Sequence, residues 1–99
     1  LADTLGVVFG SGAGGTWVRA RGLPAACYAE NDEPTPAGRD AVFVAVAKRE
    51  LPAPAVLEME IARVTEAVAA ACGRPRDRVH VCYGPPLAGR MAFGGRLVR

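Results

Sequence analysis

Histidine and cysteine are scarce in this chain of 99 residues, which contains one histidine and three cysteines. Cys27, Cys72 and Cys82 form no CxxC pair, and His80 alone cannot complete a zinc site with them. An odd number of widely spaced cysteines also differs from the disulfide framework of a small secreted domain. These scarcities lead us to expect reduced thiols, no metal centre and a cytoplasmic protein.

Long apolar runs and blocks of like charge are missing as well. No stretch approaches the ~18 apolar residues of a membrane span, and no basic-then-apolar leader opens the chain. The net charge is only +2 and the arginines are scattered, so we expect neither a membrane nor a nucleic acid as partner. The composition, 51% hydrophobic and 22% charged, is that of a globular protein. The length is sufficient for one domain over residues 1–99.

The first residues are predicted to form the end of a helix. Leu1, Leu5 and Phe9 are spaced as on one helical face, and no capping residue precedes them. We therefore expect the natural chain to begin upstream of Leu1. The glycine-rich stretch 10–15 follows this helix and lacks the Lys-Ser/Thr pair of a phosphate loop, which indicates a cap and turn.

Two segments in the first half of the chain are predicted to be strands. Residues 16–23 (TWVRARGL) are rich in β-forming side chains that alternate in character. Residues 41–50 begin with an apolar run short enough for a strand buried on both faces. The proline- and glycine-containing stretch 24–40 indicates a long loop between them, with a short strand near Tyr28.

The clearest helix is predicted over residues 53–72. Its apolar residues recur at spacings of four and three, at Leu57, Ile61, Val64, Val68 and Ala71. Pro52 and Pro54 suit its first turn, and Gly73 followed by Arg74-Pro75 ends it. We expect Cys72, near that end, to lie in the core.

Residues 78–83 (RVHVCY) are predicted to form a strand with two different faces. One face carries Val79, Val81 and Tyr83, and the other carries Arg78, His80 and Cys82. Gly84-Pro85-Pro86 must end this strand, because proline donates no backbone N–H. A short last strand is expected near residues 96–98.

This order of elements predicts an α/β fold made of tandem β-α-β units. The units would form a two-layer sandwich, with one mixed sheet and two helices on one face. The other face of the sheet would need a cover. A trimer whose sheets close around a central barrel would provide it.

Three segments in this order resemble the tautomerase superfamily, which includes macrophage migration inhibitory factor, 4-oxalocrotonate tautomerase and cis-3-chloroacrylic acid dehalogenase. RDRVHVCYG (76–84) resembles the segment that opens the last long strand of longer members. TWVRARGLPAACYAEND (16–32) is similar to the second strand and loop of bacterial members, and VFVAVAKRE (42–50) to a dehalogenase strand that ends in a substrate-binding arginine. The resemblance covers nearly the whole chain.

The resemblance implies a homotrimer that catalyses proton transfer on a small 2-oxo or enol carboxylate, without a cofactor. The base would be an amino-terminal proline, whose pKa an apolar pocket and nearby cations lower toward neutrality. No proline precedes Leu1 in this sequence, and Leu1 aligns inside the family's first helix. The first strand and the catalytic proline are therefore expected upstream.

The resemblance also assigns substrate-binding positions. Arg49 matches the arginine that grips a carboxylate, and His80 and Cys82 fall where the cytokine has a pocket tyrosine and an asparagine donor. Arg19 and Arg21 share a strand face with a tryptophan and are equally suited to a ligand or to pairing between subunits. The dehalogenase's water-activating tyrosine and glutamate fall at Cys82 and Phe93, which argues against dehalogenase-type hydration.

Two functions from different classes follow from this pattern. The first is a tautomerase-like isomerase that uses the upstream proline. The alternative is a non-catalytic trimeric binding or structural protein of the same fold, whose mature amino terminus is not proline. We prefer the enzyme, because arginine, histidine and cysteine at the matching positions would have no purpose in a scaffold.

Overall fold

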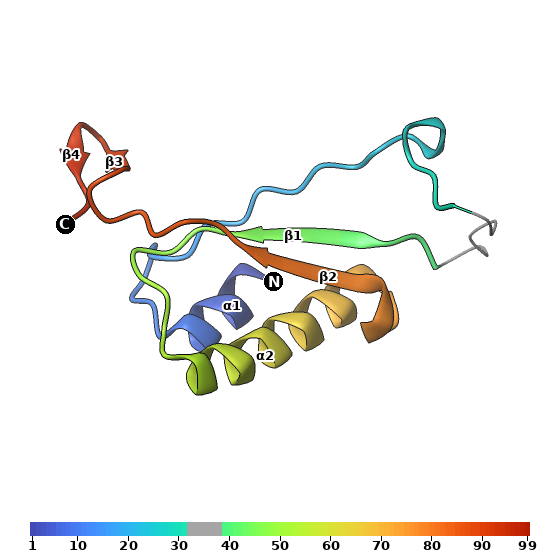
Figure 1. Ribbon diagram of the computed structural model, residues 1–99, viewed down its shortest axis with the longest axis horizontal. Helices are drawn as coiled ribbons and strands as arrows, with labels where there is room; N and C mark the ends of the chain where they lie inside the picture. Colours follow the sequence, from blue (N-terminus) through green and yellow to red (C-terminus); the bar gives the residue numbers. More distant parts are fainter. Residues whose placement is uncertain (32–38) are drawn as a thin grey trace.

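The computed structural model describes residues 1–31 and 39–99 and forms a small α/β structure (Figure 1). Its elements are α1 (Ala2–Phe9), the 3-10 turn η1 (Ala25–Cys27), β1 (Val42–Val46), α2 (Pro54–Cys72), the 3-10 turn η2 (Arg76–Arg78), β2 (Val79–Tyr83), β3 (Ala92–Phe93) and β4 (Arg96–Leu97). Both helices lie on the same side of the β1–β2 pair, and the β3–β4 hairpin stands apart near the carboxyl terminus.

Helix α2 connects β1 to β2, which pair in parallel with Val44 opposite Val81. Parallel neighbours need such a crossover, because their connecting chain must return along the sheet. Pro54 begins the helix in its first turn, where the N–H that proline lacks would have no partner. Gly73 ends it in the left-handed conformation, with φ of 62°. The predicted helix over residues 53–72 is confirmed to within one residue.

The core is small and lies where α1 and α2 meet β2. Val64 is completely buried, and Val68 and Ala69 of α2, Leu5 of α1 and Val79 of β2 surround it. The packing of α2 stops at Ala69, so Ala71 and Cys72 are exposed. The predictions that Ala71 continues the buried stripe and that Cys72 is a core thiol are therefore wrong.

Strands β1 and β2 each have one covered and one open face. In β2, Val79, Val81 and Tyr83 face the covered side, and His80 and Cys82 are exposed, as predicted. β1 alternates in the same way, and Phe43 on its open face is 66% exposed. The prediction that β1 is buried on both faces is wrong for the described residues, because both helices cover the same side.

Residues 16–23 run alongside β1 as extended chain, but they are not a strand. Within the described residues they make no backbone hydrogen bond, whereas a strand requires a bonded neighbour. The predicted strand is therefore wrong, and residues 1–31 and 39–99 form two separate two-stranded sheets. The short strand expected near Tyr28 is instead the turn η1. Residues 32–38 of the predicted loop lie outside the described residues.

The carboxyl-terminal segment is attached to the end of β1. β2 ends at Tyr83, directly before the predicted Gly84-Pro85-Pro86 stop. The N–H of Gly84 donates to the Val46 carbonyl at 2.9 Å, and that of Leu87 donates to the Lys48 carbonyl at 2.8 Å. β4 lies within the region predicted for a short last strand.

We expect Val64→Ala to destabilise the protein by about 2 kcal/mol, through lost burial and an unfilled cavity. Val56→Ala is a matched control on the same helix, since Val56 is 53% exposed, and it should change the free energy of unfolding by less than about 0.5 kcal/mol. Urea unfolding followed by circular dichroism measures both. Equal losses in the two variants would contradict the placement of the core at Val64.

Candidate functional site

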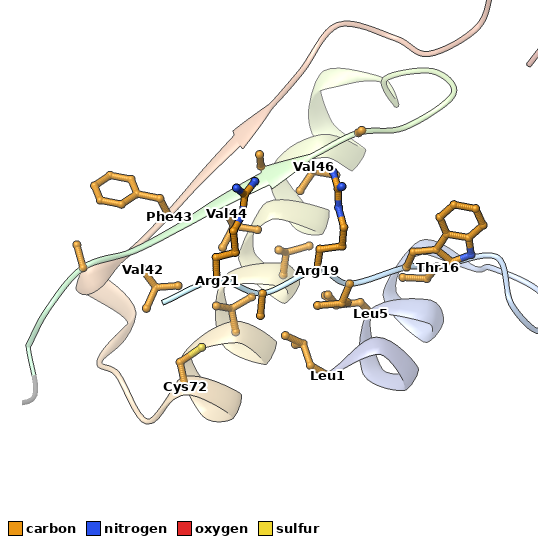
Figure 2. Close-up of a pocket in the computed structure, with 18 of the residues that line it drawn as sticks. Leu1, Leu5, Thr16, Arg19, Arg21, Val42, Phe43, Val44, Val46 and Cys72 are labelled. Atoms are coloured by element: carbon orange, nitrogen blue, oxygen red, sulfur yellow. The ribbon is translucent and has the colours of Figure 1, made fainter. Parts of the chain in front are cut away.

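A groove of about 1320 Å³ separates the extended residues 16–23 from β1. Its floor is apolar, because Leu5, Val64 and Val68 reach it from the helices below. Figure 2 shows β1 along one side, with Val42, Val44 and Val46 near the groove, and Leu1, directly before α1, and Leu5 of α1 beneath. The groove is open along its length and resembles a channel more than a closed pocket.

Two arginines reach into the groove from the extended segment. Figure 2 shows the side chains of Arg19 and Arg21 pointing from this segment toward β1. Neither arginine has an ion-pair or hydrogen-bond partner in residues 1–31 and 39–99. They therefore give the groove an uncompensated positive charge above an apolar floor.

The carboxyl end of β1 adds a further cation and an aromatic wall. Arg49 lines the groove and is exposed, and its Nε donates to the carbonyl oxygen of Arg99. Trp17 and Phe93 also line the groove, and their rings meet edge to face with centroids 5.0 Å apart. A guanidinium on a groove that also has aromatic walls is suited to an organic anion.

Lys48, the residue before Arg49, is not available to a ligand. Its Nζ lies 2.9 Å from both carboxylate oxygens of Glu60, and the Tyr83 hydroxyl donates to the same carboxylate at 2.7 Å. The Lys48 ammonium also lies 5.2 Å from the centre of the Phe9 ring. This cluster neutralises a buried acid and fixes the end of β1 on α2 and β2.

The sequence pattern did not lead us to predict the cluster of Lys48, Glu60 and Tyr83 (the Glu60 cluster), although the spacing of Glu60 on α2 indicates it. Glu60, Val64 and Val68 are spaced four residues apart, so Glu60 occupies the buried stripe of α2. A carboxylate on that stripe requires a cation or hydroxyl partner, because a buried unpaired charge is too costly. Partial burial, followed by the hydrogen bond and charge of Glu60, raises the pKa of Tyr83 above its ordinary value.

His80 and Cys82 lie away from the groove. Both are exposed on the open face of β2, and His80 packs on Phe43 with ring centroids 5.4 Å apart. The Tyr28 ring also lies edge to face with Phe43, with centroids 6.1 Å apart. The chain therefore gathers Arg19, Arg21 and Arg49 at the groove and leaves His80 and Cys82 on a separate surface, where their assignment to a neighbour's pocket stays a prediction.

A second charged cluster ties the residues after η1 to the start of β2. The Arg78 guanidinium binds the Glu30 carboxylate, and the Tyr28 hydroxyl donates to the same carboxylate at 2.9 Å. Arg39 and Asp77 pair at 2.8 Å nearby. Partial burial and the Glu30 carboxylate raise the pKa of Tyr28, and the bond to Glu30 raises that of Arg78. This cluster has a structural role, because its cations are all committed.

Within residues 1–31 and 39–99, no three His, Cys, Asp or Glu side chains gather as a metal site requires. The described helices also include none that is long and apolar enough to cross a bilayer. Comparison of the chain with protein-family models and with curated proteins finds no match.

We expect Glu60→Gln to lower the free energy of unfolding by about 1–2 kcal/mol, because it leaves the Lys48 charge without its partner. The loss is moderate because the Lys48 side chain remains 23% exposed and partly solvated. Glu58→Gln, at an exposed position on the same helix, is the control and should have little effect. If both variants unfold at the same urea concentration as the parent chain, the cluster has no structural weight.

The raised pKa of Tyr83 predicts a stability loss in alkali. A tyrosine that binds its proton more tightly in the fold stabilises the protein below its ordinary pKa of 10.0, and this contribution disappears as the pH rises through the higher folded-state value. The free energy of unfolding of the parent chain should fall more steeply above pH 10 than that of Tyr83→Phe. Denaturant unfolding at several pH values above 10, with tyrosinate absorbance to follow ionisation, tests this prediction. The same pH dependence of the free energy of unfolding in both proteins would refute it.

Proposed function

We propose that this chain forms the substrate-binding part of a tautomerase-like isomerase, which moves a proton on a small 2-oxo or enol carboxylate. The observation that carries the proposal is the position of Arg49 just after β1, on an apolar groove that Trp17 and Phe93 also line. A guanidinium can hold the substrate carboxylate through two parallel hydrogen bonds.

The cations favour enolate formation as well as binding. Removal of a proton beside a carbonyl places negative charge on the carbonyl oxygen, and a fixed cation stabilises that charge without reorganising. Arg19, which has no partner in the described residues, is the candidate for this role. Lys48 is excluded from it by its pairing with Glu60.

The base is expected from outside the described residues. The acidic side chains that line the groove are Glu30 and Asp40. Glu30 binds Arg78, and Asp40 lies 3.9 Å from Arg74, so both are occupied by arginines. An amino-terminal proline upstream of Leu1 fits this requirement. Its secondary amine would be partly uncharged near neutrality in a groove that is apolar and lined by cations.

We further propose a homotrimer in which tandem β-α-β units complete one mixed sheet. The exposed Phe43 and the neighbouring His80 and Cys82 support this assembly, because an open sheet face with aromatic and thiol side chains favours a protein cover. In such a trimer, His80 and Cys82 would contribute to the pocket of an adjacent subunit. Arg21 would then be available for pairing between subunits.

The full-length polypeptide, with its natural amino terminus, should accelerate ketonisation of the enol form of a 2-oxo carboxylate. Arg49→Gln should raise KM by about tenfold or more and change kcat less, because a charge-assisted hydrogen bond to the carboxylate is lost. Arg63→Gln is the matched control on the exposed side of α2 and should leave both constants unchanged. Ultraviolet absorbance of the enol follows the reaction.

The alternative, a non-catalytic binding or structural protein, makes the opposite prediction. A mature amino terminus other than proline, together with no acceleration by the full-length polypeptide, would favour it and overturn the enzyme. Intact mass and amino-terminal sequencing of the natively expressed protein decide the first point. The assay with Arg49→Gln decides the second.

A further inference from the structure

We propose that the carboxyl-terminal hairpin forms a surface that binds an anionic lipid bilayer at the level of its headgroups. This hairpin surface consists of exposed basic and exposed apolar side chains, which are Arg90, Arg96 and Arg99 and Trp17, Met91, Phe93 and Leu97. It is independent of the proposed activity, because it includes none of the arginines assigned to the substrate.

The hairpin segment carries positive charge without a compensating acid. Residues 84–99 contain three arginines and no aspartate or glutamate. Arg90, Arg96 and Arg99 are exposed, and none of them forms an ion pair within residues 1–31 and 39–99. The net charge of +2 does not reveal this concentration, because it includes the acids of the rest of the chain. We therefore replace the expectation of no membrane partner, which rested on that net charge.

Apolar side chains lie exposed beside these arginines. Leu97 is 52% exposed, and Ala92, directly opposite it in the β3–β4 pair, shares its face of the hairpin. Trp17 is 73% exposed and packs against Phe93, so its ring lies next to β3. Single exposed apolar residues are ordinary, whereas a group of them in one place marks an interaction surface.

The hairpin projects from the body of the protein. Figure 1 shows β3 and β4 apart from both helices and from the β1–β2 pair. Gly94 and Gly95 form the tip, with φ of 56° and 81°, as a tight two-residue hairpin turn requires. The bond from the Leu87 N–H to the Lys48 carbonyl attaches the hairpin segment to the chain that follows β1. Because it projects, the hairpin can meet a broad, flat partner before the rest of the molecule does.

The chemistry of this surface fits the headgroup region of an anionic bilayer. Guanidinium groups form bidentate hydrogen bonds with phosphate, and each basic residue near an anionic membrane adds to the attraction. Tryptophan favours the boundary between polar and apolar surroundings. The Nε1–H of Trp17 donates to the Gly14 carbonyl at 2.8 Å, so transfer of the ring into that boundary leaves no unpaired donor.

A nucleic acid fits the same surface less well. Single-stranded nucleic acids stack their bases on the open faces of aromatic rings. The rings of Trp17 and Phe93 meet each other at an interplanar angle of 80°, and Met91 and Leu97 have no ring to offer. These two aliphatic side chains instead gain from burial at the boundary of the acyl chains.

Vesicle binding tests the proposal, with Trp17, the only tryptophan of the 99-residue chain, as the reporter. Vesicles of phosphatidylcholine with about one third phosphatidylserine should shift its fluorescence to shorter wavelength and should carry the protein down on sedimentation. Vesicles of phosphatidylcholine alone should do neither. Binding should weaken by about tenfold or more between about 0.1 M and 1 M salt, because the screening length falls from about 10 Å to about 3 Å.

Matched double variants separate the hairpin surface from the overall charge. Arg90→Gln combined with Arg96→Gln should weaken binding to the anionic vesicles by about tenfold or more. Arg63→Gln combined with Arg76→Gln removes the same charge from α2 and η2 and should weaken binding by about threefold or less. Circular dichroism shows that each variant is folded.

A second pair of variants tests the apolar part of the surface. Leu97→Ser should weaken binding by about fivefold or more, because less apolar area enters the bilayer. Val7→Ser is the control, since Val7 is 74% exposed on α1, and it should leave binding unchanged.

Several outcomes would overturn the hairpin surface. They are equal binding to vesicles with and without phosphatidylserine, equal losses in the two double variants, and no binding of the chain to anionic vesicles. Binding to a single-stranded oligonucleotide that is tighter than binding to vesicles, and that the hairpin double variant loses, would make the surface a nucleic-acid site instead. None of these results changes the outcome of the tautomerase assay, so the two proposals can fail separately.

Discussion

The parallel pairing of β1 with β2 fixes the positions of most other elements. Parallel strands require a crossover, and α2 provides it on one face only, where Val64 and Val68 meet Val79. α1 adds Leu5 to the same small core. As a result, the helices cover one face of the β1–β2 pair and leave the other face exposed. The groove runs along the edge of β1 that does not pair with β2.

The cluster of Glu60, Lys48 and Tyr83 fixes the chain that follows β1 and so positions Arg49 at the groove. Glu60 takes the charge of Lys48 and the hydroxyl of Tyr83, so one carboxylate links α2 to both strands. Arg49 follows directly; in the described residues it has no ion pair with an Asp or Glu side chain, and its Nε donates to the backbone oxygen of Arg99. The two adjacent cations therefore differ in role: Lys48 stabilises the fold through Glu60, and Arg49 faces the groove.

The parts of the fold that depend on local pattern could be predicted from the sequence. The proline start and glycine end of α2, the alternation in β2 and the stop at Gly84 are all encoded within a few residues. Residues 16–23 have an equally clear strand pattern but no bonded neighbour within residues 1–31 and 39–99, because pairing depends on a second segment that local pattern cannot supply. The same reason explains β1, whose apolar run predicts burial on both faces while Phe43 is exposed.

The candidate site was predictable only in part for a related reason. Arg19, Arg21 and Arg49 do line one groove, whereas His80 and Cys82 lie on the open face. The alternation of side chains in β2 predicts that His80 and Cys82 share one face of the strand. It does not predict whether that face borders the groove. Glu60 was overlooked because a charge on a helix usually marks the solvent side, and only its spacing from Val64 indicates burial.

The pairing of Lys48 also has a consequence for the chemical reactivity of the surface. Eleven of the twelve basic residues are arginines, so Lys48 is the only side-chain amine of this chain. Its ammonium is held by two carboxylate contacts and shielded by Phe9, which leaves it a poor nucleophile toward acylating or aldehyde reagents. The positive charge that this chain presents to solvent is thus carried by guanidinium groups, which such reagents do not readily neutralise.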